Sequence, residues 1–389
     1  MRLLYACLDR GIPIGGTKGA SIHVAELLRA LEAEGHTTAV AARAFAEVSD
    51  KRLVYPLPVP GGLRFVPERI LRRDLRELRA RRKLAHGLHR AIGSFRPDLV
   101  YERYALFRTE GLGVSRRAGI PHALEVNAPL VDEERRFRGL RLGALARRAE
   151  RTCWTGADFV VVPSAAMAEL VRAAGQERVL VVPNGVDPEL FAPRPQAEAL
   201  RRSLGLEGRF VAGFAGSLKR WHDLDTLVEA AGQVHAAVLL VGDGPERERL
   251  ERAAASRGVE LRVTGAVTHE QVPDYLAAMD VCVAGLPPDP TLHYFSPLKA
   301  LEYLAAGRPA VVAAAGDLAR LADAGAALAY APGNQEELTQ LLRKLAADSQ
   351  LRSTLSRNGR AYAETRTWRS AAREIAQAAE RLRSTAANA

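Results

Sequence analysis

A turn in the second half of the chain combines glycine, a hydroxyl group and cationic side chains. It follows an apolar run at 210–215, which predicts a β-strand, and precedes a predicted helix. The residues of this turn that could bind an anion are Gly216, Ser217, Lys219, Arg220 and His222. Cationic side chains and a hydroxyl at a strand-to-helix turn are the donors that a diphosphate needs. The sequence therefore predicts a phosphate-binding turn here.

The segment around Lys299 is a second candidate for binding the same anion. The sequence reads Ser296-Pro297-Leu298-Lys299, and Glu302 follows about one helical turn later. If a helix begins near Pro297, Lys299 lies in its first turn, where the helix dipole disfavours a cation unless an anion is bound. Such a local inconsistency is typical of functional sites.

Glycine-rich loops follow two other predicted strands. The loop 11–19 contains Gly15, Gly16 and Lys18 and leads into a predicted helix. Glycine lets the backbone approach a ligand closely, and a helix N-terminus favours negative charge. The spacing is neither that of a dinucleotide fingerprint nor that of a Walker loop. A binding loop and a plain flexible connection therefore both remain open. Gly242 follows the predicted strand at 238–241 in the same way.

Short apolar runs alternate with longer helical patterns along the whole chain. In the first half they predict strands at 3–8, 37–42, 99–101, 123–126, 159–162 and 179–182. In the second half they predict strands at 210–215, 238–241, 261–263, 281–284 and 310–313. Strands separated by helices predict parallel sheets covered by helices. We therefore expect an α/β protein with two Rossmann-like domains, at 1–190 and 205–367, and a C-terminal helix at about 368–389 that packs back on the first domain.

Composition excludes several classes of protein. The chain has 389 residues, of which 48% are hydrophobic, and this is typical of a globular protein with two or three domains. Because no apolar run approaches the ~18–20 residues of a spanning helix, an integral membrane protein is not expected. The three cysteines are far apart in sequence, which argues against a disulfide framework or a structural zinc site and fits a reducing cytoplasm.

The net charge of +10 is concentrated in one half of the chain. Residues 1–190 carry 31 Lys and Arg against 22 Asp and Glu, whereas residues 191–389 carry 24 against 23. Such an asymmetry favours a polyanion or an anionic membrane as a partner, but a coding bias towards arginine explains it equally well. Nucleic acid is not expected as a partner, since aromatic residues make up only 6% of the chain and no binding module is present.

Several sequence motifs, in order, resemble the retaining family 4 glycosyltransferases of the GT-B fold. In the first half the motifs are GGTKGASIHVAELLRALEAEGH, ADFVVVPSAAMAELV and VVPNGVDPELFAP. In the second half they are FAGSLKRWHDLDTLVEA, LLVGDGPERERLE, VTGAVTHEQVPDYLAAMDVCVAG and FSPLKALEYLAAGRPAVV. The resemblance covers roughly residues 1–370. It implies two Rossmann-like domains facing each other and a nucleotide-diphosphate sugar donor held mainly by the second domain.

The resemblance also implies roles for individual residues. Glu302 matches the second glutamate of the family's E-x7-E motif, which binds the ribose hydroxyls, while Lys299 and the Ser296–Leu298 backbone match the stretch that approaches the diphosphate. The other donor-binding positions that it implies are Gly216, Ser217, His222, Gly242, Gly15 and Gly16. The residues expected to act in transfer are Lys219, Lys299, Arg220 and Asn127. It implies no cofactor and no metal ion, because positioned cations stabilise the departing diphosphate.

The sequence departs from the family pattern at two positions. Tyr294 stands where the E-x7-E motif has its first glutamate, and Asn127 stands where many members have a histidine. We assign Arg103, Glu125 and Lys18 to the acceptor side, although structural hydrogen bonding explains Arg103, Glu125 and Asn127 equally well. The Asp223-Leu-Asp225 pair falls at a predicted helix start, which favours an N-cap over a metal site.

Two basic segments, 69–83 and 135–151, could contact an anionic membrane. The first lies in a predicted helix at 67–92 with Arg69, Arg72, Arg73, Arg76, Arg79 and Lys83 along one face. The second contains Arg135, Arg136, Arg138, Arg141, Arg147, Arg148 and Arg151. A solvated helix face that pairs with nearby carboxylates is the competing interpretation. Membrane contact would place the protein on the inner face of the plasma membrane.

The function that these observations favour is retaining transfer of a hexose-type sugar from a UDP- or GDP-sugar. The acceptor would be a glycan, a lipid-linked sugar or a small molecule, in the synthesis of cell-surface polysaccharide or glycolipid. A catalytically inactive GT-B subunit and a nucleotide-sugar 2-epimerase-like enzyme are the alternatives.

Overall fold

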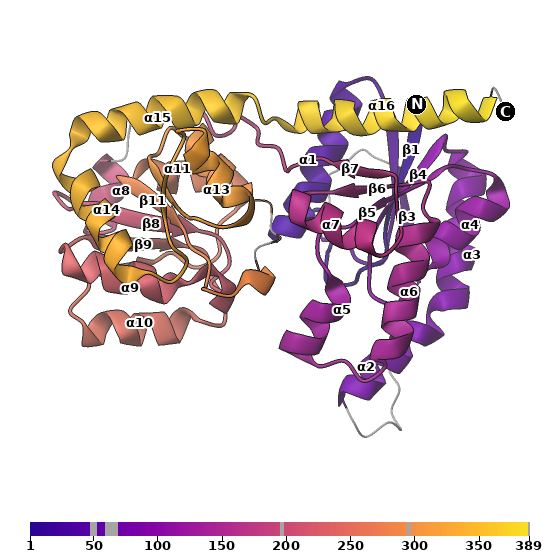
Figure 1. Ribbon diagram of the computed structural model, residues 1–389, viewed down its shortest axis with the longest axis horizontal. Helices are drawn as coiled ribbons and strands as arrows, with labels where there is room; N and C mark the ends of the chain where they lie inside the picture. The colour runs from indigo at the N-terminus through magenta and orange to yellow at the C-terminus, as the bar shows by residue number, and fades with distance from the viewer. Residues whose placement is uncertain are drawn as a thin grey trace. The chain divides into compact units, whose positions relative to one another are not determined.

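The computed structural model describes residues 1–46, 53–58, 69–194, 198–292, 294, 296 and 298–387. Pro297 and residues 67–68 of the predicted basic helix lie outside the described residues, and so do the side chains of Arg69 and Arg72. The chain forms two compact units (Figure 1). Unit 1 contains residues 1–183 and 371–389, and unit 2 contains residues 184–370.

Unit 1 is built on a parallel sheet of seven strands in the order β3-β2-β1-β4-β5-β6-β7. Its strands are β1 (Arg2–Cys7), β2 (Thr37–Ala42), β3 (Leu53–Pro56), β4 (Leu99–Arg103), β5 (His122–Glu125), β6 (Phe159–Val162) and β7 (Val179–Val181). Its helices are α1 (Gly19–Ala33), α2 (Arg69–Arg79), α3 (Arg81–Phe95), α4 (Glu110–Ala118), α5 (Leu130–Glu133), a π-helical turn (Glu134–Arg138), α6 (Gly143–Gly156) and α7 (Ala165–Ala173). β1 pairs in register with β2 on one side and β4 on the other. β1 is an apolar run over Leu3–Cys7 because it is buried on both faces, whereas β4 is equally buried although it ends in Glu102 and Arg103.

Unit 2 repeats this architecture with six strands in the order β10-β9-β8-β11-β12-β13. Its strands are β8 (Val211–Ala215), β9 (Ala237–Val241), β10 (Leu261–Val263), β11 (Val281–Ala284), β12 (Ala310–Ala313) and β13 (Leu328–Tyr330). Its longer helices are α8 (Glu198–Ser203), α9 (Leu224–Gln233), α10 (Arg247–Ser256), α11 (Val272–Ala277), α12 (Leu298–Ala305), α13 (Gly316–Asp323), α14 (Gln335–Ala347) and α15 (Ser349–Glu364). Three single turns complete it, at Arg220–His222, His269–Gln271 and Pro290–Leu292. Separate clusters of buried apolar residues fill the two faces of this sheet.

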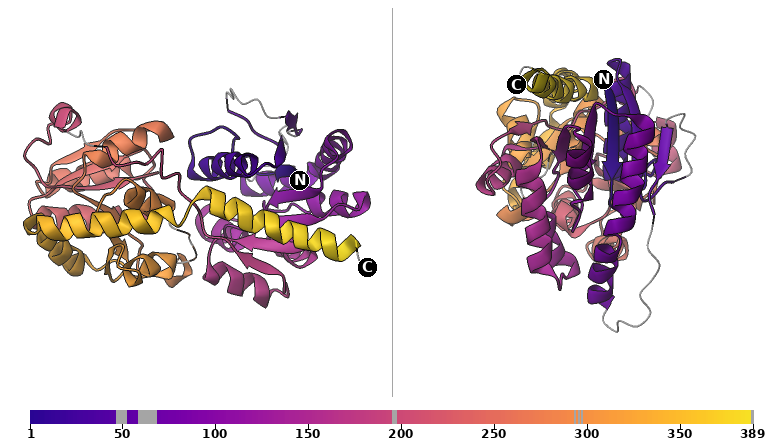
Figure 2. Two further views of the ribbon diagram at one scale, coloured as in Figure 1. Left: turned by 90° about the horizontal axis from the view of Figure 1, so that it is seen from above. Right: turned by 90° about the vertical axis from the view of Figure 1, so that its right-hand side faces the viewer.

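The last helix, α16 (Trp368–Ala387), begins in unit 2 and continues along unit 1 (Figure 2). The Arg373 guanidinium donates to both carboxylate oxygens of Glu34, at 2.6 and 3.0 Å, and Arg383 lies 3.2 Å from Asp98. These ion pairs hold the helix against the ends of α1 and β4.

Residues 184–190, which the sequence assigned to the first domain, lie in unit 2 instead. Their backbone is bound there: the Asn184 N–H donates to Ser296 Oγ at 3.1 Å, and Val186 pairs with Thr367. The Cβ atom of any residue other than glycine at position 185 would meet the Trp368 backbone at 2.3 Å. The chain therefore changes units before the Pro-rich segment that suggested a linker.

The predicted basic helix at 67–92 is in fact two helices that meet at Ala80. The Ala80 N–H donates to Glu77 O, which closes α2 with a tight turn, and Ala80 is fully buried. Tertiary contacts of α2 explain the break, since Asp74 accepts hydrogen bonds from the N–H groups of Arg141 and Leu142. The continuous basic face expected from sequence is therefore interrupted.

Two short edge strands, β3 and β13, were not predicted from the sequence.

Candidate functional site

Lys219, His222 and Lys299 gather at the carboxyl ends of the strands in unit 2. Lys299 lies in the first turn of α12, as predicted, and its Nζ is 5.5 Å from the centre of the Phe214 ring. The His222 ring lies 5.1 Å from the same phenyl ring. Lys219 Nζ lies 5.8 Å from the Trp221 ring. The turn after β8 and the start of α12 therefore bring His222 and Lys299 together at Phe214, and Lys219 is close enough to act electrostatically on His222. We call Lys219, His222 and Lys299 the cation cluster.

Two glycines allow the loops beneath this cluster to pack closely. Gly216 has a φ of 145° and Gly242 a φ of 135°, and a Cβ on Gly242 would lie 2.1 Å from Gly216 O. The Gly216 N–H donates to Val241 O at 2.9 Å, and the Leu218 N–H donates to Asp243 O at 3.0 Å. The predicted phosphate-binding turn is thus held by the neighbouring turn after β9. Only glycine fits at these two positions without strain.

Burial and mutual repulsion set the charge of the cation cluster. Burial lowers the pKa of Lys299 to about 8, against the opposing effect of Glu302. Burial also lowers the pKa of His222 well below its usual value, and Lys299 and Lys219 lower it further. His222 is therefore a neutral imidazole at pH 7. Within the described part of the chain, neither lysine forms an ion pair, so no carboxylate at ion-pair distance offsets their positive charge.

We expect the binding of a nucleoside diphosphate to weaken as the pH rises through about 8. The cause is loss of the proton from Lys299, whose charged form attracts the anion. Isothermal titration of UDP and GDP between pH 6.5 and 9.5 measures this, with Lys299→Arg as the matched variant. Arginine stays charged over this range, so its profile should be flat. A profile shared by both proteins would contradict the assignment.

Glu302 projects from α12 and is buried, with 8% of the residue exposed. Its Oε1 lies 2.9 Å from His269 Nε2. His269 begins a single turn capped by Thr268 and Gln271, and its ring rests 5.2 Å from Phe191. His269, in the segment VTGAVTHEQ, was not expected at this site, because nothing local in the sequence links it to a residue 33 positions later.

Ser296 and Leu298 are bound differently from the expectation. Ser296 Oγ accepts the Asn184 N–H at 3.1 Å, and Ser296 O accepts the Leu298 N–H at 2.9 Å. Because the Leu298 N–H is already used, a diphosphate would have to displace this bond to receive it. Tyr294, at the position of the first glutamate, is buried with 5% exposed.

Arg220 and Ser217 do not join the cation cluster. The side chain of Arg220 is 82% exposed, and its Nε lies 3.8 Å from Glu246. Ser217 is also exposed. Asp223 occupies the N-cap of α9 at a φ of 48°, but its side chain makes no capping hydrogen bond, and Asp225 pairs with Arg249 instead. Asp223 therefore occupies the expected N-cap position, but its side chain does not cap the helix. In the described residues no group of three His, Cys, Asp or Glu side chains could hold a metal ion.

In unit 1, a buried charged network lies at the carboxyl ends of the central strands. Glu125 ends β5 and accepts a hydrogen bond from Tyr5 of β1 at 2.7 Å. Arg103, at the end of β4, has its Nη1 3.4 Å from Glu125, and His23 of α1 also contacts this carboxylate. Burial raises the pKa of Glu125, but His23 and Arg103 outweigh it and hold that pKa well below its usual range. Glu125 is therefore a carboxylate.

Asn127, Gly15, Gly16 and Lys18 lie in loops beyond the same edge of the sheet. Asn127 Nδ2 is buried without a hydrogen-bond partner in the described structure, which leaves a donor available to a ligand. Gly15 has a φ of 76°, and Lys18 occupies the N-cap position of α1 while its Nζ donates to Gly11 O at 3.0 Å. The roles expected of Gly15 and Gly16 in donor binding, of Asn127 in transfer and of Lys18 on the acceptor side stay predictions.

Comparisons with known proteins decide the family. The model described as Glycosyltransferase Family 4 matches residues 17–190, and the model described as Glycosyl transferases group 1 matches residues 209–348. A D-inositol 3-phosphate glycosyltransferase of Catenulispora acidiphila is 30% identical over 80% of this chain and 78% of its own length. This chain belongs to the family 4 glycosyltransferases.

Other members of the family match over shorter stretches. A 2-deoxystreptamine N-acetyl-D-glucosaminyltransferase of Streptomyces fradiae is 34% identical over 58% of this chain and 56% of its own length. A GDP-mannose-dependent alpha-mannosyltransferase of Mycobacterium tuberculosis is 32% identical over 50% of each chain. The chain thus spans about half the length of these two relatives.

Solved structures establish the fold as GT-B, with two parallel-sheet α/β domains. Sucrose-phosphate synthase from Thermosynechococcus elongatus matches with a TM-score of 0.79 at 21% identity, covering 99% of this chain and 100% of its own. HepE of Anabaena, solved in complex with UDP-glucose, matches with a TM-score of 0.76 at 22% identity, covering 97% and 99%. The expected fold class and the expected family are both confirmed.

Proposed function

We propose that this family 4 glycosyltransferase transfers a hexose-type sugar from a UDP- or GDP-sugar with retention of anomeric configuration. The observation that carries the proposal is the cation cluster of unit 2, in which Lys219 and Lys299 surround a neutral His222 without a counterion. A departing diphosphate is the anion that such a group would stabilise, because its charge develops as the glycosidic bond to the donor breaks.

The names of relatives support a nucleotide-sugar donor but differ on the acceptor. One relative is named as GDP-mannose-dependent, one structural neighbour was solved in complex with UDP-glucose, and two relatives are named for 2-deoxystreptamine and for D-inositol 3-phosphate. We propose a glycan, a lipid-linked sugar or a small molecule as acceptor, in the synthesis of cell-surface polysaccharide or glycolipid. Asn127, with its unsatisfied buried Nδ2, is the residue of unit 1 that we assign to the reacting sugar or acceptor.

We propose that transfer needs neither a cofactor nor a metal ion. The lysines of the cation cluster supply charge that a divalent cation would otherwise supply to the diphosphate. Turnover measured with EDTA and then with added Mg²⁺ or Mn²⁺ tests this. Rates that agree within about twofold support the proposal, and a requirement for the metal contradicts it.

We propose that the protein works in the cytoplasm and contacts the inner face of the plasma membrane through its basic segments. All three cysteines are buried free thiols, which fits a reducing compartment. Arg79, Arg81, Arg82 and Arg117 line an open groove of about 590 Å³ in unit 1. No helix among the described residues is long and apolar enough to cross a membrane. In the second basic segment, Arg138 and Arg147 pair with nearby carboxylates.

The first experiment is a thermal-shift screen against UDP, GDP, ADP, dTDP and their common sugars. A ligand that binds only the folded protein raises its melting temperature. A single responding nucleotide would identify the donor class, and NMR of the product anomer would then test retention. The inactive-subunit alternative predicts no transfer, whereas the 2-epimerase alternative predicts conversion of the nucleotide sugar without any acceptor.

Replacing Glu302 by alanine is expected to weaken binding of the responding nucleoside diphosphate by about 10–100-fold, the effect of losing hydrogen bonds to a charged group. Since the ribose hydroxyls are its proposed partners, binding of inorganic pyrophosphate should stay unchanged. Isothermal titration of both ligands measures this, with Glu336→Ala, an exposed glutamate on α14, as control. Equal loss for both ligands would instead place Glu302 at the diphosphate.

A further inference from the structure

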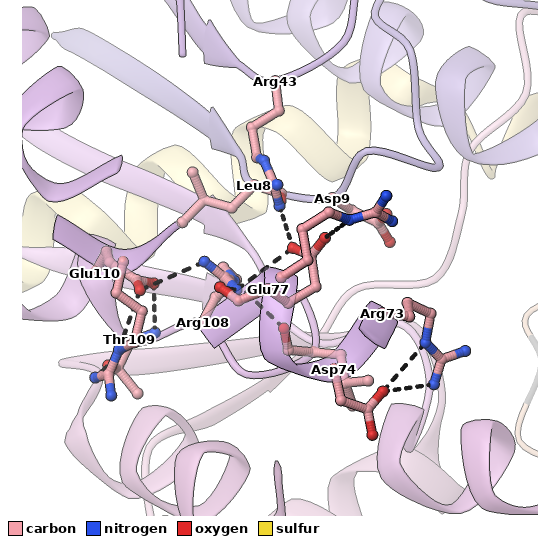
Figure 3. A network of polar contacts seen from close by, with 12 residues as sticks. Leu8, Asp9, Arg43, Arg73, Asp74, Glu77, Arg108, Thr109 and Glu110 are labelled. Carbon is pink, nitrogen blue, oxygen red and sulfur yellow. Dashed lines mark hydrogen bonds and ion pairs between the residues drawn. The ribbon is translucent and has the colours of Figure 1, made fainter. Parts of the chain in front are cut away.

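Arginines gather at a second place, on the carboxyl edge of the unit 1 sheet. Arg10 follows β1, Arg43 follows β2, Arg76 lies on α2, and Arg108 lies in the loop after β4. Figure 3 shows Arg43 and Arg108 reaching towards Glu77 from different elements. The carboxyl ends of parallel strands are where open α/β sheets bind ligands. The proposed donor site does not use any of these four residues.

The carboxylates of this cluster are too few to balance its arginines. Glu77 lies 2.5 Å from Arg43 Nη1, 3.4 Å from Arg108 Nη2 and 3.9 Å from Arg76 Nε. Glu110 lies 3.5 Å from Arg108 but is shared with Arg81 at 3.3 Å. Glu77 therefore faces three guanidinium groups, which leaves a local excess of positive charge.

Asp9, the next acidic residue, faces another way. Its carboxylate accepts the Gly11 N–H at 2.6 Å, and it raises the pKa of Arg138 rather than that of Arg10. It therefore does not serve as the missing counterion of the cluster.

Several donors of the cluster are unsatisfied. The Arg43 side chain is only 1% exposed, yet its Nε and Nη2 are buried without a hydrogen-bond partner, and Arg76 Nε is in the same state. Arg10 is exposed and forms no ion pair or hydrogen bond to the described residues. Partial burial, Arg76 and Arg43 lower the pKa of Arg10 and outweigh the opposing effect of Glu77. A buried guanidinium with unused donors is costly unless an anion completes it.

We propose that Arg10, Arg43 and Arg76 form a binding subsite for a phosphate group, and that this group belongs to the acceptor. Guanidinium forks bind phosphate oxygens in pairs, which suits three arginines approaching from two strands and a helix. Arg10 and the partly exposed Arg76 contact the phosphate from solvent, while Arg43 donates to it from below through its unused Nε and Nη2. The subsite stands on the geometry of unit 1, and only its assignment to the acceptor rests on the proposed function.

The test is a titration of inorganic phosphate into the full chain, followed by ³¹P NMR. The wild type is compared with R10M/R76M, with K299M in unit 2 and with R90M, an exposed arginine on α3 that serves as control. We expect R10M/R76M to raise the dissociation constant of the unit 1 site at least 10-fold and R90M to leave it unchanged. K299M should weaken phosphate binding only at the cation cluster of unit 2. If the donor assignment is wrong, K299M will bind phosphate as the wild type does, whatever the result for R10M/R76M.

The variant Arg43→Lys distinguishes phosphate binding from a purely structural role of Arg43 in holding α2. Lysine keeps the charge but loses the fork, so phosphate affinity should fall in a protein that still folds. A lower melting temperature with unchanged phosphate affinity in both R43K and R10M/R76M would show that the arginines only hold α2, and would overturn the subsite. Absence of phosphate binding outside the unit 2 site would overturn it as well.

Two further probes identify where the phosphate comes from. Glycerol 3-phosphate represents a soluble phosphomonoester, and phosphatidylglycerol vesicles represent a lipid headgroup, with phosphatidylcholine vesicles as control. Weaker binding of either probe to R10M/R76M supports the subsite and names the source. If R10M/R76M binds both probes as the wild type does, the subsite is wrong.

Discussion

Replacing Lys299 by methionine is expected to lower turnover by about 10²–10³-fold, the usual effect of removing one preorganised donor from a developing anion. Methionine keeps most of the apolar stem that packs near Phe214 and Gly216, so the loss is that of the charged Nζ. The measurement is kcat and kcat/KM with the donor found by the thermal screen. Because the negative charge grows during departure of the diphosphate, kcat should fall more than KM rises.

The matched control is Lys344→Met, an exposed lysine near the end of α14 in the same unit. It should transfer sugar at the wild-type rate. If Lys299→Met also retained the wild-type kcat and lost only donor affinity, Lys299 would stabilise the bound donor but not the transition state. In that case Lys219, the other lysine of the cation cluster, becomes the candidate for stabilising the leaving group.

Glu125→Gln is expected to destabilise unit 1 by about 3–5 kcal/mol, because it leaves Arg103 buried without its carboxylate. The loss should appear as a lower midpoint in urea unfolding at pH 7. Since the pKa of Glu125 is held below its usual range, the carboxylate contributes its full stability above the ordinary carboxyl pKa. That contribution is lost as the pH falls through the lowered pKa, so the wild type and the variant should converge in acid.

A double variant tests the cause of this effect. Arg103→Met combined with Glu125→Leu removes both buried charges and should cost less than Glu125→Gln alone. Glu169→Gln, an exposed glutamate on α7, is the control and should unfold like the wild type. Additive losses for Arg103→Met and Glu125→Leu would show that the two side chains are not coupled.

The sequence by itself was sufficient for the fold class and most of the strands. The runs at 37–42, 159–162, 261–263, 281–284 and 310–313 coincide with strands of the structure. Those at 159–162, 281–284 and 310–313 are apolar throughout because these strands are buried on both faces. β13 was missed because its Leu328-Ala329-Tyr330 stretch contains no β-branched residue and merges with the alanine-rich residues around it. The turn at 216–222 and Lys299 could be selected as candidate phosphate-binding groups because glycine and a first-turn lysine have local conformational or electrostatic costs.

Tertiary structure alone decided which residues meet. His269 contacts Glu302 and Asn184 binds Ser296 across long stretches of chain, and no periodicity encodes such pairs. The break at Ala80 and the exposed position of Arg220 likewise follow from packing. Sequence patterns report what each segment prefers on its own, whereas burial and pairing of charges depend on neighbours that only the folded chain supplies.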